Sequence, residues 1–143
     1  MSEPTQANAE DRQEYIDSMA RSRGYVLDFH KLMAKQDFDV LVASNNMVKA
    51  AYLDERSLDR GTKELIFIVS LTVMRASKAH IQSHIRVALD VGLTPRQILE
   101  AIEIALPEAG IVAFQAGVEA WAEVVNAERL EPTIDVRALD GSS

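Results

Sequence analysis

Apolar residues recur every three or four positions along most of this 143-residue chain, and glycine, proline or a capping residue separates one such stretch from the next. This spacing gathers the apolar residues on one face of a helix. The stretches that show it span about residues 11–23, 26–36, 38–53, 62–75, 78–91, 95–106 and 108–128. The sequence therefore predicts an all-α fold, an antiparallel helical bundle of about six to seven helices.

The stretch from Thr62 to Arg75 is strongly apolar, and its β-branched residues would also suit a strand. It is too long for a typical strand, so we predict a buried helix. Asp59 or Thr62 can cap the start of this helix, and Ser77 can cap the next one. Thr94, which a proline follows, is a typical start for the helix after that.

The chain length fits one domain, with little room for a second. We predict a flexible lead over residues 1–8, a single helical domain over residues 9–128 and an extended arm over residues 129–143. The two ends are assigned in this way because they lack the helical periodicity of the rest. A short helical chain with this many apolar residues is expected to bury some of its surface in a homo-oligomer.

Charge excludes several classes of partner. The net charge of −7 disfavours binding to nucleic acid or to anionic membranes, both of which require an excess of Lys and Arg. The longest apolar run, from Leu65 to Met74, is much shorter than the roughly 20 residues that cross a bilayer. The N-terminus lacks the basic and apolar parts of a secretory signal, so we expect a cytoplasmic protein.

The chain contains no cysteine. This excludes disulfide bonds, thiolate metal sites, cysteine nucleophiles and dithiol redox exchange. The sequence also has no glycine-rich phosphate loop, so no nucleotide cofactor is indicated. The sequence therefore predicts no cofactor.

Three segments with characteristic spacing carry a family resemblance: residues 58–66, 77–84 and 92–100. Together they resemble the carboxymuconolactone decarboxylase and alkylhydroperoxidase D-like superfamily, over about residues 55–125. The resemblance implies the helical fold of that superfamily, a small-molecule substrate and a trimeric or hexameric assembly. In the peroxidase branch, two cysteines stand seven and four residues before a histidine. If that histidine is His84, Ser77 and His80 occupy those positions, so the resemblance favours the decarboxylase branch.

Two histidines one helical turn apart are the main candidates for chemistry. His80 and His84 project from the same face of one predicted helix, where one ring can act as an acid and the other as a base. Glu64 lies on the preceding helix, which an antiparallel hairpin brings alongside, although it can also simply pair with Arg60. We predict His84, His80 and Glu64 as catalytic residues.

Substrate contacts are predicted from residues close to these histidines. Arg75 can hold a carboxylate or enolate oxygen, and the hydroxyls of Ser77 and Ser83 lie on or beside the same helix. His30 is most simply a structural residue, although its helix could line the same pocket.

The preferred function is cofactor-independent acid–base catalysis, of the decarboxylase or isomerase type, on a small carboxylated lactone or enolisable acid. One alternative is a non-catalytic module for small-molecule binding or assembly that has lost the redox thiols of the superfamily. Another is a metal-dependent lyase or hydrolase, because histidines at positions i and i+4, here His80 and His84, can bind one ion together with a carboxylate. No metal is predicted in the preferred reading.

Overall fold

Helices joined by short turns make up residues 6–126, the part of the chain that the computed structural model describes. No strand occurs within this range, so the predicted all-α class is confirmed. In chain order the helices are α1 (Ala9–Arg23), α2 (Asp28–Gln36), α3 (Phe38–Val48), the short π-helix η1 (Lys49–Leu53), α4 (Arg60–Val73), α5 (Lys78–Asp90), α6 (Pro95–Glu103), α7 (Ala105–Ala109) and α8 (Ile111–Val124). Predicted features beyond this range, including the C-terminal arm at 129–143, lie outside the described residues.

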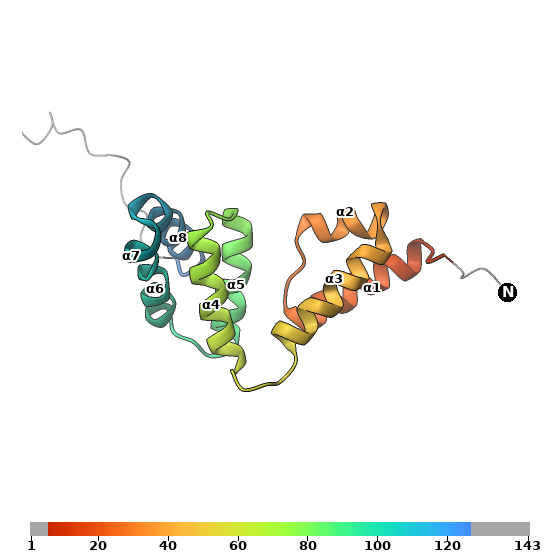
Figure 1. Ribbon diagram of the computed structural model, residues 1–143, viewed down its shortest axis with the longest axis horizontal. Coiled ribbons are helices and arrows are strands. Elements are labelled where there is room, and N and C mark those ends of the chain that lie inside the picture. Colours follow the sequence, from red (N-terminus) through yellow and green to blue (C-terminus); the bar gives the residue numbers. More distant parts are fainter. Residues whose placement is uncertain (1–5, 127–143) are drawn as a thin grey trace, which may run out of the picture.

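The helices form two groups, which Figure 1 shows side by side. Helices α1, α2 and α3 pack on one another, and α4 to α8 form the other group. The segment between η1 and α4 joins the groups at one end. The connection from α1 to α2 runs along the side of the first group that faces α5, and this side becomes important for the site.

Each group has its own cluster of buried apolar side chains. In the group from α4 to α8, five isoleucines have no exposed surface, and each contributes roughly 2 kcal/mol by its removal from water. They are Ile68, Ile81, Ile85, Ile98 and Ile102. A smaller cluster of Ile16, Met19, Ala34 and Leu41 holds α1, α2 and α3 together. Among residues 6–126, no helix has both the length and the apolar character that crossing a membrane requires.

The predicted helix starts are largely confirmed. Asp59, and not Thr62, caps α4, because its carboxylate accepts a hydrogen bond from the Thr62 backbone at 2.7 Å. The Ser77 hydroxyl accepts from the backbone N–H at the start of α5, and Thr94 does the same for α6. Each cap satisfies a backbone donor that the first turn of a helix leaves without a partner.

The predicted stretches 95–106 and 108–128 put a helix boundary at Pro107, and this boundary is wrong. Helix α6 ends before Ile104 instead, and Pro107 lies inside the short helix α7. As the third residue of α7 it stands in the first turn, where a missing backbone N–H costs no helical hydrogen bond. The break comes at Gly110, whose φ of +88° is unfavourable for other residues, and α8 starts directly after it.

Gly117 lets α8 pack closely on α4 and α6. A Cβ atom at this position would lie 2.7 Å from the Thr72 side chain and 2.8 Å from that of Ile102. We expect Gly117→Ala to destabilise the protein by about 1–2 kcal/mol in urea denaturation, since overpacking outweighs the gain of up to about 1 kcal/mol in helix propensity. Gln115→Ala, an exposed change on the same helix, serves as the control and should stay within about 0.5 kcal/mol of wild type. A stabilised Gly117→Ala protein would contradict this close packing.

Candidate active site

Glu64 and His84 form a fully buried pair between α4 and α5. Neither residue has any exposed surface, and His84 Nδ1 lies 2.7 Å from Glu64 Oε2. The two helices form the predicted antiparallel hairpin, with Ser77 at the start of α5. The contact expected between Glu64 and His84 is therefore present, at direct hydrogen-bonding distance.

The other oxygen of Glu64 has two further partners. The Tyr52 hydroxyl donates to Glu64 Oε1, and Arg60 Nε donates to the same oxygen at 2.8 Å. Burial acts to raise the pKa of Glu64, but the hydrogen bonds from His84, Tyr52 and Arg60 outweigh it, so the pKa lies below its usual value. Glu64 is therefore an ionised carboxylate in the protein interior.

An ionised carboxylate fixes which nitrogen of its histidine partner carries a proton. Glu64 can only accept hydrogen bonds, so His84 Nδ1 must carry a proton, and Nε2 holds a lone pair when the ring has no second proton. The Tyr25 hydroxyl lies 3.1 Å from this Nε2 and donates to it. Burial raises the pKa of Tyr25, so the hydroxyl keeps its proton at neutral pH. Glu64, His84 and Tyr25 thus form one chain of hydrogen bonds.

Aromatic side chains hold the His84 ring in place. Phe67 stacks on it with ring centroids 4.4 Å apart and planes inclined by 8°. The Tyr52 ring packs against Phe67 at 4.6 Å, and Tyr25 meets the His84 ring edge-on at 4.9 Å. The imidazole is therefore fixed in orientation by packing as well as by its two hydrogen bonds.

His80 lies beside His84, with ring centroids 5.5 Å apart, as expected from their spacing on one helix. His80 is half-buried, whereas His84 is sealed from solvent. Burial, together with the neighbouring His84, lowers the pKa of His80, so its ring is neutral at pH 7. Within residues 6–126 no group of three or more metal-binding side chains comes together, and both nitrogens of His84 already have partners.

The predicted substrate-binding residues lie apart from this chain of hydrogen bonds. Arg75 is exposed in the turn between α4 and α5, with a φ of +57°. The Ser77 hydroxyl caps α5, and the Ser83 hydroxyl donates to the Ala79 carbonyl at 2.8 Å. The hydrogen bonds of both serines are therefore structural.

No sequence pattern points to Tyr25 or Tyr52, and Arg60 is expected only as an alternative partner of Glu64. Arg60 precedes Glu64 by four residues, a spacing that brings two side chains together on a helix. The tyrosines carry no such signal. Tyr25 meets His84 across 59 positions of sequence, and only the packing of α5 against the α1–α2 connection creates that contact.

His30, the third histidine of the chain, lies close to this site. It is buried in α2, and its Nδ1 accepts a hydrogen bond from the Leu27 backbone N–H at 2.9 Å. Its Nε2 lies 3.1 Å from Nη1 of Arg23. Burial, Arg23 and His80 together lower the pKa of His30 to about 4. His30 is therefore neutral at pH 7.

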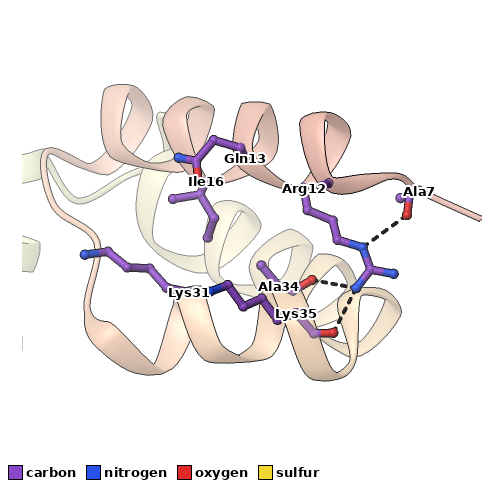
Figure 2. Close-up of a pocket in the computed structure, with 8 residues that line it drawn as sticks. Ala7, Arg12, Gln13, Ile16, Lys31, Ala34 and Lys35 are labelled. Carbon is purple, nitrogen blue, oxygen red and sulfur yellow. Dashed lines mark hydrogen bonds between the residues drawn. The ribbon is translucent and has the colours of Figure 1, made fainter.

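One hollow on the surface of the described residues, of about 790 Å³, lies between α1 and α2. Figure 2 shows Arg12 at its rim, where the guanidinium donates to the carbonyls of Ala34 and Lys35. Arg12 thus donates hydrogen bonds to backbone carbonyls in the last turn of α2. Another hollow, of about 310 Å³, follows the segment between η1 and α4 and borders Tyr52 and Arg60. His84 lines neither hollow.

Comparison with known proteins identifies the family. The sequence profile of the carboxymuconolactone decarboxylase family matches residues 39–123, and this is more than half of the chain. The protein therefore belongs to the carboxymuconolactone decarboxylase family. The matched segment includes Tyr52, Glu64 and both histidines of α5.

The fold is also similar to a solved structure, that of a Burkholderia xenovorans LB400 protein provisionally named a carboxymuconolactone decarboxylase. The TM-score is 0.73, the sequence identity is 18%, and the match covers 95% of this chain and 99% of that one. At this identity the likeness shows the shared fold. No curated protein matches the chain.

The lowered pKa of His30 predicts a loss of stability in acid. Between about pH 6.5 and pH 4 the unfolded chain binds a proton at this histidine and the folded chain does not, so stability falls as the pH falls. The full effect is about 3 kcal/mol at pH 4 and vanishes above pH 7. In His30→Asn, whose side-chain oxygen can still accept from Leu27, this part of the acid loss should disappear. Urea denaturation at several pH values measures it, and parallel curves for variant and wild type would contradict the assignment.

Proposed function

We propose that this protein is a cofactor-independent acid–base catalyst, of the decarboxylase or isomerase type, that acts on a small carboxylated lactone or enolisable acid. The observation that carries the proposal is the chain of hydrogen bonds from Glu64 through His84 to Tyr25. A carboxylate that orients an imidazole, and an imidazole that receives a hydroxyl proton, form an arrangement suited to general acid–base catalysis. Membership of the carboxymuconolactone decarboxylase family supports the same reaction type.

For an isomerisation, the substrate meets the half-buried Tyr25 and not the sealed His84. A proton leaves a substrate carbon for the Tyr25 oxygen as the tyrosine's own proton passes to His84 Nε2. The electron pair of the broken C–H bond moves into the substrate as an enolate. The Glu64 carboxylate stabilises the imidazolium that forms. Return of the proton to a different carbon moves the double bond.

For a decarboxylation, the same chain runs in the opposite direction. The bond between the substrate carbon and its carboxylate breaks, carbon dioxide leaves, and the electron pair remains on the carbon. When His84 carries a second proton, on Nε2, it gives this proton to the Tyr25 oxygen as the Tyr25 hydroxyl proton passes to that carbon. His80, neutral and half-buried beside His84, is suited to restore the proton from solvent.

The complete burial of His84 favours a second candidate function. In this candidate the Glu64–His84 pair only stabilises the fold, and the protein binds a small molecule without changing it. The two functions differ in whether a bound lactone acid is consumed.

The test uses 4-carboxymuconolactone as the substrate, with release of carbon dioxide as the readout. We expect His84→Gln and Tyr25→Phe each to lower kcat/KM by about 10²- to 10⁴-fold, the usual effect of removing a proton-transfer group. Tyr15→Phe is the matched control. It removes a hydroxyl that accepts a hydrogen bond from Asn45 in the other apolar cluster, and it should leave turnover unchanged.

Two results would count against catalysis. Full turnover in His84→Gln would exclude His84 from the reaction. Tight binding of unreacted 4-carboxymuconolactone by the wild-type protein, with no product formed, would favour the binding module.

We also propose that the protein forms a homo-oligomer, a trimer or hexamer, in the cytoplasm. Large apolar side chains are more than half exposed in both helix groups, and a second copy could cover them: Met47, Met74, Ile111 and Val112. Light scattering after size exclusion should give a mass three or six times that of the 15.8 kDa chain. A single species of 15.8 kDa at micromolar concentration would contradict the assembly.

A further inference from the structure

Arg23 is a buried cation whose hydrogen bonding is incomplete. Its side chain belongs to the last turn of α1, and the residue is only 4% exposed. Nη2 donates to the side-chain oxygen of Asn45, and the guanidinium lies 5.6 Å from the centre of the Tyr25 ring. Its Nε–H has no hydrogen-bond partner within the described residues. Burial of a charged group with an unsatisfied donor lowers the stability of the folded state, and such groups are rare in protein interiors.

The contact between Arg23 and His30 also lacks a hydrogen-bond acceptor. Leu27 donates its backbone N–H to His30 Nδ1, so the neutral ring must carry its proton on Nε2. Arg23 has only donors, and its Nη1 lies 3.1 Å from that same Nε2. Two donors therefore face each other, and neither has an acceptor there. An anion placed against both would satisfy them together.

The charges around this position do not balance. Glu64 offsets the charge of Arg60, with which it forms an ion pair at 2.8 Å. The three histidines of the chain include two, His30 and His80, whose lowered pKa values keep them neutral at pH 7. No carboxylate within residues 6–126 forms an ion pair with Arg23, and the C-terminal end of α1 supplies only about half of a negative charge. The charge of Arg23 therefore lacks a full counter-charge, which one bound anionic group would supply.

Arg23 and His84 both contact the same residue, Tyr25. The Tyr25 ring lies against the Arg23 guanidinium, and the Tyr25 hydroxyl donates to His84 Nε2. An anion bound at Arg23 would thus be held next to the hydroxyl that begins the proposed proton path. Tyr25 and His80 are both half-buried, so this side of the site is closer to solvent than His84 is.

We propose that Arg23 and His30 form a binding site for one carboxylate of a small organic acid. The carboxylate supplies the acceptors that the Arg23 Nε–H and the His30 Nε2–H lack. Binding at this position does not depend on catalysis. Its role in placing the substrate carbon at Tyr25 rests on the proposed function. Arg23, and not the exposed Arg75, is then the cation that recognises the substrate.

The test is titration calorimetry of the full-length protein with 5-oxotetrahydrofuran-2-carboxylate, a small lactone acid, and with its uncharged carboxamide. We expect the carboxylate to bind wild type roughly 10- to 100-fold more tightly than the carboxamide, and Arg23→Met to remove this preference. Arg21→Met is the matched control, because Arg21 lies on the same helix, is exposed and pairs with Glu14. Equal affinity of wild type for acid and amide, or an unchanged preference in Arg23→Met, would overturn the proposal.

A thermal melt without ligand separates a binding role from a structural one. If Arg23 is kept for ligand binding, Arg23→Met removes an uncompensated buried charge, and its Tm should equal or exceed that of wild type. The carboxylate should then raise the Tm of wild type but not that of the variant. A Tm that falls by more than about 5 °C without ligand would make Arg23 a structural residue and overturn the proposal. The comparison of acid with amide needs only the wild-type protein, so it remains decisive if the variant fails to fold.

Nuclear magnetic resonance of the histidine rings gives an independent readout. A bound carboxylate beside His30 should raise the pKa of that ring from about 4, and an unchanged pKa in the presence of saturating probe would count against the site. His84→Gln separates this proposal from the proposed function, because it should abolish turnover and leave binding of the probe intact. Loss of turnover with retained binding supports both ideas. Binding without any turnover in wild type supports the Arg23 site alone.

Discussion

The rest of the site depends on the hydrogen bonds that one buried carboxylate, that of Glu64, accepts. It accepts hydrogen bonds from Tyr52 at the end of η1, from Arg60 on its own helix and from His84 on α5. Arg60 also donates to the backbone carbonyl of Arg23, so the same network reaches the first group of helices. Removing this one charge would leave Arg60 without its counter-ion and His84 without its orienting partner.

The fold could be predicted because its signals are local. The apolar spacing of each helix and the caps at Asp59, Ser77 and Thr94 depend on residues within one or two turns of each other. Pro107 misled the prediction for the same reason. A proline marks the end of one helix or the first turn of another, and only the position of the break, which falls at Gly110, decides between them.

The site could be predicted only in part. His84 and Glu64 lie on consecutive helices of one hairpin, so helical geometry and a family resemblance were sufficient to pair them. Tyr25 lies in the connection after α1 and Arg23 in the last turn of α1, both in the other helix group, and no period or motif links them to α5. For the cation that holds the substrate, the sequence offers only proximity to the histidines along the chain, and this criterion selects Arg75.

The Tyr25–His84 bond spans the two helix groups, which a single linking segment joins at one end. Tyr25 is anchored beside α1 and His84 on α5, so a hinge-like displacement of one group against the other lengthens this bond directly. Such a displacement would also uncover the ring of His84. The proposed proton path is therefore continuous only while the two groups stay in contact at Tyr25 and His84.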